Sequence, residues 1–173
     1  MNKKLAIQGG TPRFSQPLHV GHPNMGDYAK FDARMKDLWD RNWLTNNGPY
    51  VQEFEATIAE RLGVRHCIAV CNGTVGLEIA VRALELTGEV IVPAFTFIAT
   101  AHAVRWQRLT PVFCDVHPDT HLINPESARS LITPKTSAIL AVNLWGTPCD
   151  LDSLQALADE HQLNLLYDSS HAF

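Results

Sequence analysis

The stretch EVIVPAFTFIATAHAVRWQRLTPVFCDV, residues 89–116, contains the alternation that decides the fold. It begins with a short apolar run rich in Val and Ile (89–93), passes through a segment that is apolar on nearly all sides (96–108), and ends in a second apolar run (111–116). Short runs without polar alternation are typical of strands buried on both faces of a parallel sheet. The stretch therefore predicts two strands joined by a well-covered helix.

The same alternation extends through most of the chain and predicts the fold class. Five strands alternating with four helices form a series of strand–helix–strand units. Such a series predicts a three-layer α/β/α fold around a doubly wound, mainly parallel sheet. The predicted strands are 66–70, 89–93, 111–116, 137–143 and 164–168, and the predicted helices between them are 74–87, 96–108, 125–132 and a segment with Leu151, Leu154, Leu157 and Ala158 on one stripe.

The first part of the chain has a different character. Residues 1–30 carry glycines and prolines without periodicity and predict an irregular arm, whereas helices are predicted over 31–43 and 49–62. We divide the chain into an N-terminal arm and helix, 1–48, and the first part of a larger domain, 49–173. No crossover that would cover the sheet follows the last predicted strand, so we expect this sequence to be the N-terminal part of a longer polypeptide.

The composition argues against several classes of function. Apolar residues make up 46% and charged residues 18% of the chain, and the formal net charge is −4. This balance argues against a nucleic-acid-binding protein and against disorder. No apolar run approaches the ~18–20 residues of a membrane span, and no signal-peptide core is visible. We therefore expect a cytoplasmic protein without membrane contact, and the low charged fraction predicts that some of its surface is covered by another chain.

The cysteines and histidines predict no metal site. The four cysteines lack paired CxxC spacing and are interpreted as small buried apolar residues in a reducing compartment. The pairs His19–His22 and His117–His121 lie among prolines, without a Cys or carboxylate cluster at zinc-site spacing.

Ligands of open α/β sheets bind outside the carboxyl ends of the strands, so the residues after each predicted strand are candidates for a site. Gly73 and Thr74 follow the first predicted strand and open a helix. A glycine admits close approach of the backbone, and the free N–H groups of a helix N-terminus attract an anion such as a phosphate. The alternative is an ordinary turn into a helix, capped by Thr74 or Asn72.

An aromatic ring and a carboxylate follow other predicted strands. Phe95 or Phe97 is able to stack on a flat heteroaromatic ligand, or belongs to the core. Asp168 ends an apolar strand, where an unpaired charge is costly. It either meets a cation such as a protonated pyridine nitrogen, with His171 nearby, or forms an Asx-type turn. Together, these features predict a site for pyridoxal phosphate (PLP), a flat phosphorylated pyridine.

Six motifs follow one another from about Leu44 to the end of the chain. They are LTNNGPYVQEFE (44–55), CNGTVGLEIAVRAL (71–84), EVIVPAFTFIATAHAV (89–104), PVFCDV (111–116), ITPKTSAILAVNLWG (132–146) and YDSSHAF (167–173). In order and spacing they resemble the PLP-dependent sugar-nucleotide aminotransferases of the DegT/StrS family, which have the aspartate-aminotransferase-like fold.

The resemblance implies a role for each candidate residue. Gly73 and Thr74 would hold the phosphate of PLP through backbone and hydroxyl donors. Phe97 would stack on the pyridine ring. Asp168 would pair with the ring nitrogen, and His171 would lie near the phenolic oxygen.

The chain departs from the family pattern at three points. Asn72 stands where the family usually has Ser, and Asn143 stands where it often has His. The Schiff-base lysine of the family lies downstream of the motif that contains Asp168, so we assign no catalytic residue in this chain and expect it to be inactive by itself. None of its lysines is interpreted as the Schiff-base residue; they are Lys3, Lys4, Lys30, Lys36 and Lys135.

By resemblance, the complete protein transfers an amino group from an amino acid such as glutamate to a keto sugar attached to a nucleotide, and it acts as a homodimer. Two alternatives stay open. One is a PLP-dependent sugar dehydratase of the same fold, in which a histidine replaces the lysine. The other is a truncated, non-catalytic protein that dimerises or binds a ligand.

Overall fold

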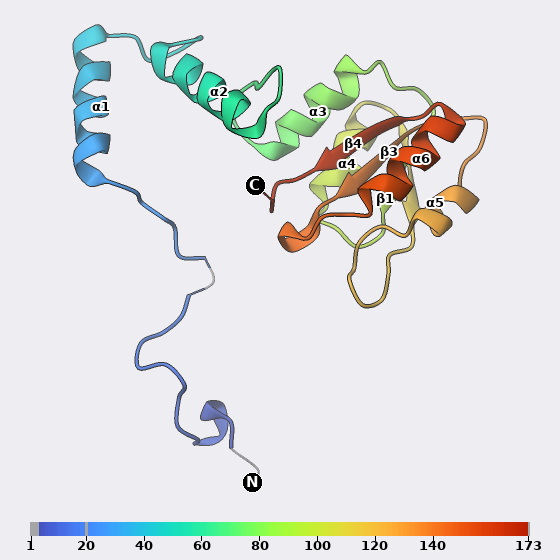
Figure 1. Ribbon diagram of the computed structural model, residues 1–173, viewed down its shortest axis with the longest axis horizontal. Helices are drawn as coiled ribbons and strands as arrows, with labels where there is room; N and C mark the ends of the chain where they lie inside the picture. The colour runs from blue at the N-terminus through green and yellow to red at the C-terminus, as the bar shows by residue number, and fades with distance from the viewer. Residues whose placement is uncertain (1–3, 20, 173) are drawn as a thin grey trace. The chain divides into compact units, whose positions relative to one another are not determined.

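The computed structural model describes residues 4–19 and 21–172, and the chain forms two compact units, Met1–Arg61 and Leu62–Phe173 (Figure 1). The predicted arm includes residues 1–3 and 20, and the motif YDSSHAF ends at 173; these positions lie outside the described residues. The predicted boundary after residue 48 concerns the domains of the complete protein, and it stays a prediction.

The first unit is helical and has little core. It contains a short 3-10 helix (Ala6–Gln8), helix α1 (Tyr28–Arg41) and helix α2 (Pro49–Leu62), so both predicted helices are confirmed. α1 begins three residues before its predicted start, because the Asp27 side chain accepts hydrogen bonds from two backbone N–H groups of the first turn. No residue of α1 or α2 is buried.

The second unit is built on a parallel sheet. Its strands are β1 (Glu89–Pro93), β2 (Thr110–Cys114), β3 (Thr136–Val142) and β4 (Asn164–Asp168). They lie in the order β2-β1-β3-β4, and all three neighbouring pairs are parallel. The four corresponding predictions are confirmed, with strand ends that agree to within two residues.

The helices of the second unit are α3 (Gly73–Ala83), α4 (Ala99–Trp106), α5 (Pro125–Ser130) and α6 (Leu151–His161), with a short 3-10 helix at Leu144–Gly146. α3, α5 and α6 each begin after an Asn or Asp whose side chain accepts hydrogen bonds from the first turn. Among the residues that the structure describes, no helix has both the length and the apolarity to cross a bilayer.

The inner strands β1 and β3 are covered on both faces, and this gives the predicted three layers. Val90 and Val92 point to one face, where they pack in a cluster that includes Val104 of α4. Ile91 points to the other face, where it packs in a cluster that includes Leu157 of α6. The helix pairs α3 with α4 and α5 with α6 accordingly lie on opposite sides of the sheet (Figure 1). The expected three-layer α/β/α fold is confirmed.

The prediction of a strand at 66–70 is wrong. The segment leads from α2 to α3 without entering the sheet, and the side chains of Ile68 and Val70 are 77% and 41% exposed. A strand inside a parallel sheet needs apolar cover on both faces. The apolar composition of 66–70 favours burial, but the described residues provide no such cover for it.

The strand order creates a topological switch point between β1 and β3. The chain passes from β1 through α4 to β2 on one side of β1, and then through α5 to β3 on the other side. At such a point, the connections leave in opposite directions and open a crevice at the carboxyl ends of the strands. The loops after β1 and β3 border this crevice.

Candidate active site

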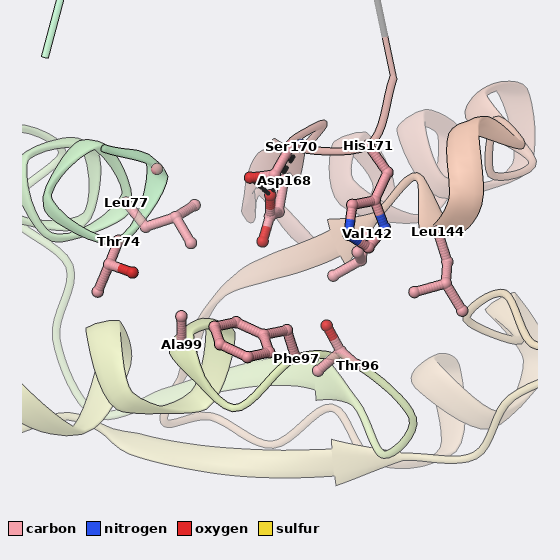
Figure 2. A pocket seen from close by; sticks show the side chains of 11 residues that line it. Thr74, Leu77, Thr96, Phe97, Ala99, Val142, Leu144, Asp168, Ser170 and His171 are labelled. Carbon is pink, nitrogen blue, oxygen red and sulfur yellow. Dashed lines mark hydrogen bonds between the residues drawn. The ribbon is translucent and has the colours of Figure 1, made fainter. Parts of the chain in front are cut away.

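The five predicted site residues all line one pocket at the carboxyl ends of the strands, together with other residues of the same loops (Figure 2). The pocket is formed by the N-terminus of α3, the loops after β1 and β3, and the loop after β4. The predicted residues are Gly73, Thr74, Phe97, Asp168 and His171, and the further lining residues are Leu77, Thr96, Ala99, Val142, Leu144 and Ser170.

The first turn of α3 lies against the loop after β4. A Cβ atom on Gly73 would lie 2.9 Å from Ser170 Oγ, so a larger residue at this position would force the Ser170 side chain to shift. The side chain of Asn72 accepts a hydrogen bond from the N–H of Val75 at 3.0 Å and caps the helix. The cap predicted as an alternative is therefore present, but it is Asn72, and the Thr74 hydroxyl is left to face the pocket (Figure 2).

Asp168 is the buried carboxylate of the pocket. It ends β4, is 9% exposed, and points into the pocket (Figure 2). Its Oδ1 accepts hydrogen bonds from the backbone N–H and the hydroxyl of Ser170, at 3.1 and 2.6 Å. The contact with the backbone N–H of Ser170 forms an Asx-type turn, one of the two predictions for Asp168. The turn and a carboxylate that faces the pocket are both present. The other oxygen, Oδ2, accepts a hydrogen bond from Thr100 at 3.2 Å.

Of the two candidate aromatic rings, Phe95 and Phe97, only Phe97 lines the pocket. It is 69% exposed. Phe95 instead packs against His121 and Trp145, with ring centroids 5.2 and 5.9 Å apart. An exposed apolar ring beside a carboxylate offers a face to a flat ligand, and Phe97 has this position.

His171 has a defined hydrogen-bonding state. The backbone N–H of Trp145 donates to its Nδ1 at 3.2 Å. Because that N–H is only a donor, Nδ1 carries no proton, and the proton of the neutral ring lies on Nε2. His171 therefore presents to a ligand one N–H donor.

Asn143, which stands where the family often has His, does not line the pocket. Its side-chain N–H donates to Ser169 Oγ at 2.8 Å, and its Oδ1 accepts from the N–H of Cys149 at 2.9 Å. Asn143 thus connects the loop after β3 to the loop after β4, two loops that border the pocket.

Sequence analysis assigned no role to Thr96, Thr100 or Ser170. Thr96 and Ser170 line the pocket, and Thr100 is fully buried behind it. Because Thr96 lies in the loop before α4 and Thr100 in its first turn, no regular sequence spacing marks the pair. Among residues 4–19 and 21–172, no group of three or more His, Cys, Asp or Glu residues is arranged to hold a metal ion.

The pocket fits the ring of PLP in size and donor set. Its volume is about 210 Å³, below the roughly 300–1,000 Å³ of pockets that enclose drug-sized ligands. A single ring with its substituents matches this space, whereas a nucleotide-linked sugar needs further room. The buried carboxylate suits a cationic ring nitrogen, and the first turn of α3 suits a phosphate. An open parallel sheet with these groups at its switch point has the architecture of α/β proteins that bind a phosphorylated ring cofactor.

The chain belongs to the DegT/DnrJ/EryC1/StrS aminotransferase family, which matches residues 27–173. It is 44% identical over 156 residues to dTDP-4-amino-4,6-dideoxy-D-glucose transaminase of Escherichia coli, covering 90% of this chain and 42% of the relative. It is 38% identical over 140 residues to GDP-perosamine synthase of Vibrio cholerae, covering 80% of this chain and 38% of the relative. The chain thus spans less than half the length of these curated relatives.

Solved structures agree with the family. DesI, crystallised in the presence of its TDP-sugar product, superposes with a TM-score of 0.87 at 50% identity, over 97% of this chain and 43% of that one. The protein ntda from Bacillus subtilis, with bound cofactor PMP, superposes with a TM-score of 0.78 at 30% identity, over 85% of this chain and 35% of that one. The resemblance to the family is confirmed, and so is its expected cofactor, of which PMP is the amine form.

Proposed function

We propose that this chain is the cofactor-binding part of a PLP-dependent aminotransferase that acts on nucleotide-linked keto sugars. The observation that carries the proposal is the buried Asp168 carboxylate facing a ring-sized pocket, beside the N-terminus of α3. The activities named for the two relatives, a dTDP-amino-sugar transaminase and a GDP-perosamine synthase, support this substrate class and favour amino transfer over dehydration.

Each residue has a distinct task in this proposal. Gly73 and Thr74 bind the phosphate through backbone N–H groups and a hydroxyl. Phe97 supports one face of the ring and excludes water from it. Asp168 pairs with the protonated ring nitrogen, and His171 donates from Nε2 to the phenolic oxygen. When bound there, PLP would supply an electron sink for the carbon next to the reacting nitrogen.

The net reaction moves one amino group. The amino acid leaves as its 2-oxo acid, and the ketone carbon of the sugar gains the amine. The carboxylate of Asp168 favours this chemistry by keeping the ring nitrogen protonated, because a nearby negative charge stabilises a cation.

The Schiff-base lysine is proposed to come from outside residues 62–173. Lys135 is the one lysine in that part of the sequence, and it lies just before β3. The pocket is at the other end of this seven-residue strand, roughly 20 Å away at about 3.3 Å per residue. We further propose that the complete protein is a homodimer, in keeping with its low charged fraction of 18%.

Cofactor binding tests the site. We expect the complete protein to bind PLP in an absorbance titration, and Asp168→Asn to weaken binding by about 2 kcal/mol or more, roughly thirtyfold in Kd, because the ring nitrogen loses a buried charged partner. Asp152→Asn, a matched change of an exposed carboxylate on α6, should leave the Kd unchanged.

Two results would contradict the proposed site: wild-type protein that does not bind PLP, or an Asp168→Asn variant that binds it as tightly as the wild type. The reaction itself is tested by incubating the loaded protein with glutamate and a nucleotide-linked keto sugar. Mass spectrometry should then detect the amino sugar together with the 2-oxo acid.

A further inference from the structure

Two hydroxyl groups, one buried and one partly buried, lie in line with the pocket carboxylate. Thr100, in the first turn of α4, is fully buried, and its Oγ1 lies 3.2 Å from Asp168 Oδ2. On its other side, the same oxygen lies 3.0 Å from Thr96 Oγ1. The two threonines thus connect the loop after β1 to the end of β4, although Thr100 and Asp168 are 68 residues apart in sequence.

The hydrogen bonds of these two hydroxyl groups have a single direction. An ionised carboxylate only accepts hydrogen bonds, so the one hydroxyl proton of Thr100 points to Asp168. Thr100 then has no proton left for Thr96, and Thr96 must donate to Thr100. On the opposite carboxylate oxygen, Ser170 donates through both its N–H and its hydroxyl.

Asp168 is therefore held by three neutral donors. Donors that contact the charged form of a carboxylate stabilise it, and because they are neutral they leave its negative charge uncompensated. The ion pairs found among the described residues do not include Asp168. The negative charge of Asp168 is therefore available to a cationic group of a ligand in the pocket.

The apolar surroundings of Thr100 would make its buried hydroxyl destabilising if the hydroxyl did not donate a hydrogen bond to Asp168. Its helix neighbours Ala99, Ala101 and Ala103 are buried apolar residues, and a buried hydroxyl without a partner costs roughly 1–3 kcal/mol in proteins. Valine has the same shape and would fill the site without that cost. The position thus favours a residue that donates to Asp168 over one that only packs.

We propose that Thr100, oriented by Thr96, is a positioning residue that holds the Asp168 carboxylate aimed at the ring nitrogen of the cofactor. The inference rests on the proposed function, because it concerns the same site. It adds a specific claim: the hydroxyl of Thr100 acts on the ring nitrogen and on no other part of the ligand.

A ligand pair separates this role from packing. The complete protein is titrated with PLP and with an analogue in which carbon replaces the ring nitrogen. Thr100→Val should raise the Kd for PLP about tenfold, as expected for loss of a hydrogen bond to a charged group, and should leave the Kd for the analogue at the wild-type value. Thr100→Ser retains the hydroxyl and should restore PLP binding.

The outcomes are distinguishable. If Thr100→Val weakens both ligands equally, or if Thr100→Ser fails to restore binding, the proposed role is overturned. If Thr100→Val does not fold, Thr96→Val tests the same pair of hydroxyl groups and should weaken PLP about threefold with no effect on the analogue. A wild-type protein that binds neither ligand overturns the proposed function itself.

Discussion

Two apolar runs of equal length adopt different structures in this protein: HCIAV at 66–70 and EVIVP at 89–93. EVIVP becomes β1, an inner strand whose Val90, Ile91 and Val92 are fully buried. HCIAV remains outside the sheet, and Ile68 is 77% exposed. The difference shows that an apolar run becomes an inner strand only where other segments cover both of its faces.

The cover of β1 comes from the next helix along the chain and from segments much further away in the sequence. Val104 of α4 lies on one face, whereas Ile139 of β3 and Leu157 of α6 belong to the cluster on the other. The run 66–70 has the residues of a strand, but it stays outside the sheet and Ile68 is 77% exposed. Substitutions in the two runs should therefore differ in their effect on stability.

The largest expected difference concerns two isoleucines. Ile91→Ala should lower the free energy of unfolding by about 2–5 kcal/mol, because it removes a fully buried side chain and leaves a cavity. Ile68→Ala should change it by less than about 0.5 kcal/mol, because this side chain is mostly exposed. Denaturant unfolding of both variants measures the difference. Equal losses would mean that 66–70 is buried as deeply as β1.

The glycines that precede the two runs give a smaller contrast. Gly88 and Gly63 both have a positive φ, +68° and +65°. A Cβ on Gly88 would collide with the carbonyl oxygen of Lys135, whereas a Cβ on Gly63 would meet no atom within 4 Å.

Gly88→Ala should therefore cost about 3 kcal/mol, from backbone strain and overpacking together. Gly63→Ala should cost about 1 kcal/mol, from strain alone. Thermal unfolding of the two variants under identical conditions measures both. A Gly63→Ala variant that loses as much stability as Gly88→Ala would refute the explanation.

The smallest expected effect needs no substitution: it is the difference in alkylation between two cysteine thiols. Cys71, directly after the exposed run, is itself exposed, whereas Cys114 at the end of β2 is buried. Burial raises the pKa of the Cys114 thiol, so the protonated form persists to higher pH in the folded protein than in the unfolded one. Alkylation followed by peptide mass spectrometry should show Cys71 modified in the folded protein and Cys114 only after unfolding.

Raising the pH through the usual thiol range should accelerate alkylation of Cys114 in the unfolded protein and not in the folded one. Because the pKa of Cys114 is higher in the folded than in the unfolded protein, the protonated thiol stabilises the fold below the unfolded-state pKa. This contribution to the free energy of unfolding is lost as the pH rises through the folded-state pKa. Modification of Cys114 at the rate of Cys71 in folded protein would contradict this.

Much of the fold was predictable because its signals are local. The strands at 89–93 and 164–168 were predicted to the residue, and the Asn124–Pro125 start of α5 is visible as a cap followed by proline. α4 was predicted to begin at 96 but begins at Ala99, because the chain still bends at 94–96 after leaving β1.

The candidate site was predictable in part. Asp168 stood out as a charge at the end of an apolar run, and the family resemblance pointed to Gly73, Thr74, Phe97 and His171. The structure brings all five to one pocket. Thr100 gave no such signal, because a threonine at the start of a helix is ordinary until its hydroxyl is found against Asp168.

The sequence by itself determined three features: the order of strands and helices, the capped helix starts, and the position of a carboxylate at a strand end. Each of these depends on neighbouring residues, whose spacing and backbone hydrogen bonds are local. Only the tertiary structure decided which apolar run is covered on both faces and which hydroxyl contacts Asp168. These outcomes depend on packing and hydrogen bonds between segments that are distant in the chain, and no local pattern encodes them.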